Sequence, residues 1–188
     1  MAMQELNPIT MPLDGHNLIE ASAGTGKTYT ITALYLRYLL GMQIEGIKSE
    51  PLTLEQILVV TFTEAATSEI KDRVRNRLIV ARDALLGDKC DDEAVNAIIE
   101  PMDEAQRKHA FALLDAGAKS MDDAAIFTIH GFCQRMLKQH AFESGVAFNL
   151  DFVLDQTELL NEALKDFWRG FVYPLNMEKT QAVLDIYP

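Results

Sequence analysis

One octapeptide constrains the fold of this chain more than any other feature. Residues 21–28 read Ala-Ser-Ala-Gly-Thr-Gly-Lys-Thr and match the phosphate-loop pattern G-x-x-x-x-G-K-[ST] at every fixed position except the first, where alanine replaces glycine. The apolar run Asn17–Ala21 before it predicts a buried strand. From Thr28 to Leu40 apolar residues recur at helical spacing and Gly41 follows, so this segment predicts a helix. Strand, glycine-rich loop and helix in this order are the setting of a phosphate site.

Each residue type in this loop has a chemical reason. Glycines allow a tight turn that aims successive backbone N–H groups at a phosphate. The lysine reaches the β- and γ-phosphate oxygens, and the last hydroxyl is a magnesium ligand. We therefore expect ATP and Mg²⁺ as cofactors, Lys27 and Thr28 as the catalytic residues, and Thr28 as the metal ligand. The cofactor-binding residues are Ala21, Ser22, Ala23, Gly24, Thr25, Gly26, Lys27 and Thr28.

Strands and helices alternate along the rest of the chain, which is typical of an α/β fold with a parallel sheet. The predicted elements are strands at 57–61 and 124–128 and helices at 64–86, 93–100, 103–118, 129–141 and 158–170. The second and third of these helices follow an acidic loop, and we expect them to form a surface insertion. Three strands are too few for a finished sheet, so the domain is expected to be incomplete.

Charge limits the classes of partner. The 188 residues carry 17 basic and 28 acidic side chains, a net charge of −11, whereas a free-standing nucleic-acid binder usually has a basic surplus. The distribution is uneven: residues 61–82 have a net charge of +2, and residues 88–123 one of −6. Two cysteines exclude a disulfide framework. No apolar run approaches the ~18 residues of a membrane span, and the first residues do not read as a signal peptide, so we expect a cytoplasmic protein.

Two segments follow predicted strands and should lie at the carboxyl edge of the sheet, where α/β proteins bind ligands. One contains Thr61, Phe62 and Thr63, and the other contains Thr128, His130 and Gly131. Hydroxyls beside an aromatic or imidazole ring can hold a sugar-phosphate backbone and stack a base. The alternatives are structural: Thr63 can cap the next helix, Phe62 can belong to the core, and His130 can simply pack.

Other parts of a motor site are missing from the pattern. No apolar strand ending in an acidic residue follows Thr28, so a second magnesium carboxylate is not identified. We expect nucleotide binding without hydrolysis by this chain alone. Tyr29 can lie against a purine or can simply pack. Two other functions stay open: a small phosphate-loop kinase, and a nucleotide-binding adaptor whose acidic helices dock a partner protein.

Three segments in order resemble motifs I, Ia and Ib of superfamily 1 DNA helicases of the UvrD/Rep type. They are AxAGTGKT, ILVVTFTEAATSEIKDRV and FTIHGFCQRML. The stretch AAIFTIHGFCQRMLKQHAFESG is similar, more closely, to the branch of this family in which a nuclease domain follows the helicase motor. Glu64-Ala65 stands where the general pattern has Asn-Lys, and Tyr29 where it often has arginine. The resemblance covers residues 13–168.

The resemblance implies a fold, a site and partners. It implies a P-loop NTPase (RecA-like) sheet flanked by helices, with residues 1–150 as the first part of the motor domain and a helical insertion at about 88–120. Residues 151–188 would begin a helical subdomain. The DNA-binding residues carried over are Thr61, Phe62, Thr63, Thr128, His130 and Gly131. The implied partners are single- and double-stranded DNA and the other subunits of a heterotrimeric exonuclease complex, with no membrane.

Overall fold

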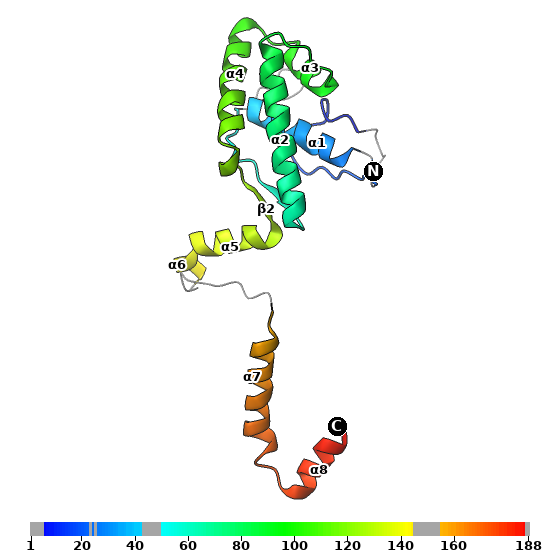
Figure 1. Ribbon diagram of the computed structural model, residues 1–188, viewed down its shortest axis with the longest axis vertical. Coiled ribbons are helices and arrows are strands. Elements are labelled where there is room, and N and C mark those ends of the chain that lie inside the picture. The colour runs from blue at the N-terminus through cyan, green and yellow to red at the C-terminus, as the bar shows by residue number, and fades with distance from the viewer. Residues whose placement is uncertain (1–5, 23, 25, 43–49, 145–154, 187–188) are drawn as a thin grey trace. The chain divides into compact units, whose positions relative to one another are not determined.

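The structure is a computed structural model that describes residues 6–22, 24, 26–42, 50–144 and 155–186 (Figure 1). Its strands are β1 (Val59–Thr61) and β2 (Ile126–Thr128). The α-helices are α1 (Lys27–Leu40), α2 (Glu64–Leu85), α3 (Glu93–Ile99), α4 (Glu104–Lys119), α5 (Ile129–Gln139), α6 (Ala141–Ser144), α7 (Thr157–Phe167) and α8 (Met177–Ile186). A 3₁₀ turn, Met121–Asp123, precedes β2, and a π-helical turn, Trp168–Val172, follows α7. None of the described helices is long and apolar enough to span a bilayer.

The two strands pair in parallel, with Val59 opposite Ile126 and Thr61 opposite Thr128. Because the pairing is in register, both strands end at the same edge. Parallel strands need a long crossover, and here α2, α3 and α4 provide it. The parallel arrangement expected from the sequence is confirmed for these two strands, so the described chain is an α/β structure with a small sheet and many helices.

Local signals in the sequence explain where the helices begin and end. Gly41 ends α1 in a left-handed conformation, φ 64°, as its position after the apolar periodicity predicted. Thr63 caps α2: its hydroxyl accepts a hydrogen bond from the Ala66 N–H at 3.1 Å. Asp103 and Gln106 form a reciprocal capping box at the start of α4. The helical predictions for these segments are confirmed to within two residues.

The prediction of a strand at 17–21 is wrong for the described residues. The backbone there belongs to no ladder, and Leu18 is 88% exposed. Hydrogen bonds to a neighbouring strand are what hold an extended segment in a sheet. β1 and β2 pair only with each other in the part of the chain that the structure describes. The apolar run marks a segment whose residues suit a strand. It does not specify the second strand with which that segment would have to pair.

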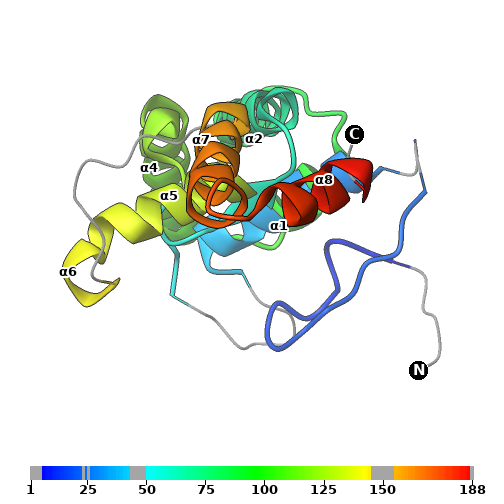
Figure 2. The same cartoon turned by 90° about the horizontal axis from the view of Figure 1, so that it is seen from below.

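The expectation of a surface insertion at α3 and α4 is also wrong as regards packing. Val95, Ile99 and Leu114 are 0–5% exposed and belong to the same core cluster as Leu36 and Leu78. α4 lies along α2, and α1 crosses both helices (Figure 1). Figure 2 shows the same arrangement with α2 and α4 seen nearly end-on. Glu93 and Glu104 are exposed and Asp115 is half-buried, while the apolar faces of both helices belong to the core. α3 and α4 are therefore integral to the folded unit.

The contacts divide the chain into two units, residues 1–136 and 137–188. The boundary expected between residues 150 and 151 lies outside the described residues. In the second unit the rings of Phe167 and Phe171 stack with centroids 5.2 Å apart. The predicted helix at 158–170 is present as α7 and the π-helical turn. Sequence analysis missed α8, which begins after Asn176, whose side-chain oxygen accepts a hydrogen bond from the Lys179 N–H.

Candidate functional site

The last two residues of the phosphate-loop pattern, Lys27 and Thr28, are the first two residues of α1. Gly24 and Gly26 have φ values of 79° and 88°, the left-handed region that favours glycine. Gly26 is the N-cap residue of α1 and contributes no side chain to the cap. The helix therefore begins with backbone N–H groups at a glycine turn, an arrangement that suits an anion. Two of the predicted site residues, Ala23 and Thr25, lie outside the described residues.

Lys27 is the first residue of α1, and its side chain folds back over the loop. Its Nζ donates hydrogen bonds to the carbonyl oxygens of Ala21, at 2.9 Å, and Ser22, at 2.5 Å. Lys27 is exposed. These two hydrogen bonds place its ammonium group beside the turn that would bind the phosphates. Thr28 is half-buried next to it. The structure thus brings together, around one turn, the described residues that the sequence assigned to phosphate binding.

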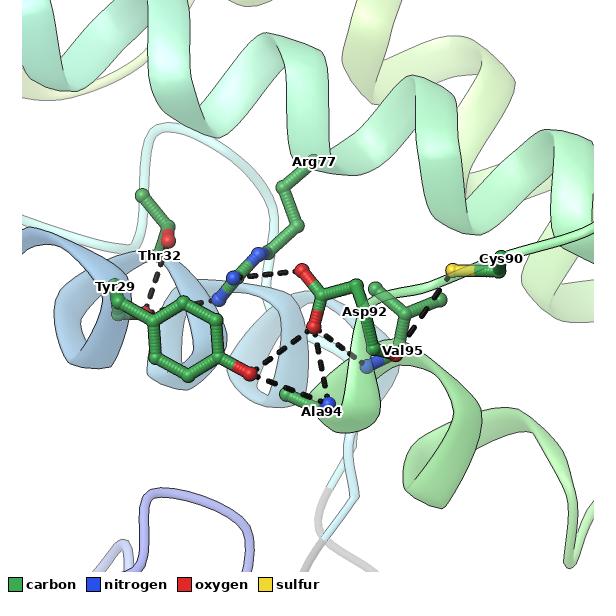
Figure 3. Close-up of polar contacts among 7 residues, drawn as sticks. All are labelled: Tyr29, Thr32, Arg77, Cys90, Asp92, Ala94 and Val95. Carbon is green, nitrogen blue, oxygen red and sulfur yellow. Dashed lines mark hydrogen bonds and ion pairs between the residues drawn. The ribbon is translucent and has the colours of Figure 1, made fainter.

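A polar network of Tyr29, Arg77 and Asp92, the Tyr29 network, joins the first turn of α1 to α2 and to the start of α3 (Figure 3). The Arg77 guanidinium donates to the Tyr29 carbonyl at 2.9 Å and to Asp92 Oδ2 at 2.7 Å. Its Cζ also lies 4.2 Å from the centroid of the Tyr29 ring. Burial, and then the Asp92 carboxylate, raise the pKa of Tyr29. Three helices thus meet at the first turn of α1.

Asp92 has a second role in the Tyr29 network as the cap of α3. Its Oδ1 accepts hydrogen bonds from the N–H groups of Ala94, at 3.0 Å, and Val95, at 3.3 Å, and from the Tyr29 hydroxyl at 3.1 Å. The Arg77 side chain is only 8% exposed, so its charge is neutralised inside the protein. Every member of this network is hydrogen-bonded, which fixes the orientation of the Tyr29 ring.

We expect Arg77→Met to destabilise the chain by about 1–3 kcal/mol, because it leaves Asp92 and the Tyr29 carbonyl without a charged partner. The exposed pair Arg73–Glu69, also on α2, offers the matched control Arg73→Met, whose cost should stay below about 1 kcal/mol. Urea unfolding followed by circular dichroism measures both. Equal costs for the two variants would show that the interactions of Arg77 contribute no more to stability than an exposed ion pair does.

The N-terminal segment runs beside α1 and is attached to it. Arg37 is 2% exposed and donates to the carbonyl oxygens of Pro8, at 2.8 Å, and Met11, at 2.9 Å. Burial lowers the pKa of this guanidinium. The same segment forms part of the wall of a hollow of about 450 Å³ beside the Tyr29 ring. Its lining consists of Leu6, Asn7, Pro8, Ile9, Tyr29 and Glu93.

The first of the two strand-end loops is held rigidly from within. The hydroxyls of Thr61 and Thr67 lie 2.6 Å apart, and each lies 3.1 Å from the Thr63 carbonyl oxygen. Thr61 is 8% exposed, so it positions the loop rather than facing solvent. Phe62, between Thr61 and Thr63, is 86% exposed. The alternative that Phe62 is a core residue is therefore wrong for the described structure, while the capping role of Thr63 is confirmed.

The second loop starts α5. The Thr128 side chain is 7% exposed and accepts a hydrogen bond from the Gly131 N–H at 3.1 Å. Its hydroxyl donates in turn to Glu64 Oε1, also at 3.1 Å. His130 is exposed. The structure therefore brings both predicted segments to one edge, with Phe62 and His130 outward and the hydroxyls of Thr61 and Thr128 inward.

Sequence reasoning missed Arg77, Asp92 and Glu64 as parts of this site. One signal pointed to the pair Arg77–Asp92. Arg77 interrupts the apolar face that Val74, Leu78 and Ala81 form on α2. An arginine buried on such a face requires an acidic partner. Asp92 directly precedes a helix, the position of a capping residue. The contact of Glu64 with Thr128 spans 64 residues and had no local signal.

Comparison with known proteins identifies the family of this chain. The sequence profile of the UvrD/REP helicase N-terminal domain matches residues 1–183. The chain belongs to this helicase family. It is 46% identical to the RecBCD enzyme subunit RecB of Escherichia coli over 184 residues and 47% identical to that of Haemophilus influenzae over 186 residues. The RecB subunit of Mycobacterium tuberculosis is 33% identical over 158 residues.

These alignments cover 98%, 95% and 83% of this chain. They cover only 14–15% of the length of each RecB relative. The resemblance to UvrD/Rep-type helicases noted from three motifs is thus confirmed over nearly the whole chain, and the similarity is to an N-terminal part of RecB. Membership of a helicase family places the chain among enzymes.

Proposed function

We propose that this chain is the ATP-binding N-terminal part of an ATP-dependent DNA helicase subunit with a P-loop NTPase fold. One observation supports nucleotide binding above the others: Lys27 opens α1 at a turn whose two described glycines have positive φ. Backbone N–H groups, an ammonium group and a helix N-terminus together form an anion site. Residues 21–28 would bind the phosphates.

The donor set at the start of α1 also fits a magnesium ion. A threonine hydroxyl beside a phosphate-binding lysine is the ligand that Mg²⁺ takes in phosphate loops, and Thr28 stands there next to Lys27. When bound, the ion would neutralise phosphate charge. The hollow beside Tyr29 would accept the nucleotide base, because it adjoins the turn that follows the phosphate residues. The Tyr29 network would hold the ring that forms its wall.

The DNA site of the proposal is the edge formed by the two strand-end loops. Phe62 would stack a base of a single strand, with Thr63, His130 and Gly131 contacting the same strand and Thr61 and Thr128 holding the loops. Stacking on an aromatic ring contributes about 1–3 kcal/mol per base. That energy acts against a net charge of −11, so DNA affinity of these 188 residues alone should be poor.

The relatives are RecB subunits of the RecBCD enzyme, and this likeness supports a wider proposal for the complete protein. It would unwind double-stranded DNA ends in recombinational repair as one subunit of a heterotrimeric helicase–exonuclease in the cytoplasm. Membership of a helicase family favours this function over a small phosphate-loop kinase or a nucleotide-binding adaptor. Calorimetric titration of the complete protein with ATP, with and without single-stranded DNA, tests this helicase function. In a kinase or an adaptor, the affinity for ATP would not depend on the DNA.

Phe62→Ala in the complete subunit should weaken single-strand binding by roughly 5- to 150-fold, the equivalent of one lost stacking contact. Its free energy of unfolding should change by less than about 0.5 kcal/mol, because the side chain is 86% exposed. Fluorescence anisotropy with oligothymidine and thermal melting measure the two quantities.

The matched control for Phe62→Ala is Phe171→Ala, another exposed phenylalanine, 69% exposed and in the other unit. DNA affinity should be unaffected by that change. If Phe62→Ala melts early but binds DNA normally once folded, the residue belongs to the scaffold and the DNA-site proposal is refuted.

A further inference from the structure

The two strand-end loops leave the sheet at the same level. Thr61 pairs with Thr128 in the parallel register, so Phe62 and His130 each follow one member of that pair by one or two residues. Their separation therefore depends on how the residues just beyond the strands are joined. Backbone hydrogen bonds hold the two strands together as far as Thr61 and Thr128. Beyond these residues, side-chain hydrogen bonds connect the two loops.

Glu64 joins one loop to the other. It is the first residue of α2, and its Oε1 accepts the hydrogen bond of the Thr128 hydroxyl at 3.1 Å. A hydroxyl has one hydrogen, so donating to Glu64 turns a lone pair of the Thr128 oxygen toward the Gly131 N–H. The approach is close, because a Cβ at Gly131 would lie 3.1 Å from that oxygen. Glu64 thus orients the group that caps α5.

We propose that Glu64 is a positioning residue for single-stranded DNA, holding the Phe62 loop and the His130–Gly131 loop at a fixed spacing. This inference rests on the proposed DNA site. The charge of Glu64 is unfavourable for that function, because a carboxylate beside a DNA strand repels phosphate and the chain already has a net charge of −11. A carboxylate in this place needs a compensating role, and accepting the Thr128 hydrogen bond is such a role.

A structural alternative exists. Glu64 lies in the first turn of α2, where a carboxylate stabilises the helix through the helix dipole. Comparing two substitutions separates the roles. Glu64→Gln and Glu64→Ala both remove the charge, and with it the dipole effect and the repulsion of DNA. Only Glu64→Gln keeps a side-chain oxygen that can accept from Thr128.

The experiment measures the affinity of the complete subunit for oligothymidine by fluorescence anisotropy, with melting temperatures beside it. We expect Glu64→Gln to bind at least as tightly as the wild type, and Glu64→Ala to bind roughly three- to tenfold more weakly than Glu64→Gln. The melting temperatures of the two variants should agree closely. Thr128→Val should bind more weakly than Thr128→Ser, which keeps the hydroxyl, and this comparison tests the same bond if Glu64→Ala folds poorly. The double variant Glu64→Ala/Thr128→Val should bind no more weakly than Thr128→Val.

Glu64→Ala binding as tightly as Glu64→Gln, with Thr128→Val also normal, overturns the inference. The proposed function fails in a different way. In that case the wild type does not bind the oligonucleotide, or Phe62→Ala binds it as well as the wild type does, and the positioning role falls with the site. Weak binding by Phe62→Ala together with equal binding by the two Glu64 variants refutes only the role of Glu64.

Discussion

Lys27→Ala is expected to reduce MgATP binding by roughly 10- to 150-fold, which removes it from the range that calorimetry of this chain detects. The ammonium group contributes charge-assisted hydrogen bonds to the phosphates, and each is worth about 1.5–3 kcal/mol. In the structure this group already lies on the carbonyl oxygens of Ala21 and Ser22, at the turn that would receive the phosphates. Titration calorimetry and nucleotide-dependent melting measure the effect.

The control for Lys27→Ala is Lys108→Ala, a lysine on α4 that makes an exposed ion pair with Glu104. That variant should bind nucleotide as the wild type does. Because Lys27 also contacts the loop itself, both variants should first be shown to melt within a few degrees of the wild type. Unchanged affinity in a folded Lys27→Ala variant would disprove the assignment of residues 21–28 to phosphate binding.

Leu114→Ala should destabilise the chain by about 2–5 kcal/mol, the range for removing a leucine from a packed core. The side chain is 0% exposed and packs in the cluster that joins α1, α2 and α4. A loss of this size is a large fraction of the total stability of a small domain. Denaturant unfolding followed by circular dichroism provides the measurement.

Leu86→Ala is the matched control, because Leu86 is 69% exposed where α2 ends. Its cost should stay within about 0.5 kcal/mol. If Leu114→Ala were as mild as Leu86→Ala, α4 would not belong to the core and the surface insertion expected from the acidic sequence would be the better description.

Helices α1, α2 and α4 were predictable because local signals in the sequence mark where they begin or end. The apolar spacing of α1, the cap Thr63 and the capping box at Asp103 all act within four residues. Packing was less predictable. The acidic residues of α3 and α4 suggested exposure, yet an amphipathic helix can carry a net negative charge and still bury one face. The strand expected at 17–21 failed because pairing depends on a neighbour, which no local pattern specifies.

The candidate site also has a part that was predictable from local sequence and a part that was not. The positive φ values of Gly24 and Gly26 and the position of Lys27 at a helix start could be expected from the motif alone. The contacts of Arg77 with Tyr29 and of Glu64 with Thr128 join residues 48 and 64 positions apart, and the fold alone brings them together. Their residue types gave at most a hint, because a buried arginine or an acidic residue in the first turn of a helix has many possible partners.

A single helix, α2, begins with Glu64 at the edge proposed to bind DNA and holds the first turn of α1 through Arg77. The two residues lie thirteen positions apart along the helix, about 20 Å at 1.5 Å per residue. Side chains between them, such as Val74, are part of the core. A destabilising substitution there would disturb the one helix that supports both proposed ligand sites. Simultaneous loss of nucleotide and DNA affinity in such a variant would therefore report damage to the shared support, and only variants that separate the two affinities identify contact residues.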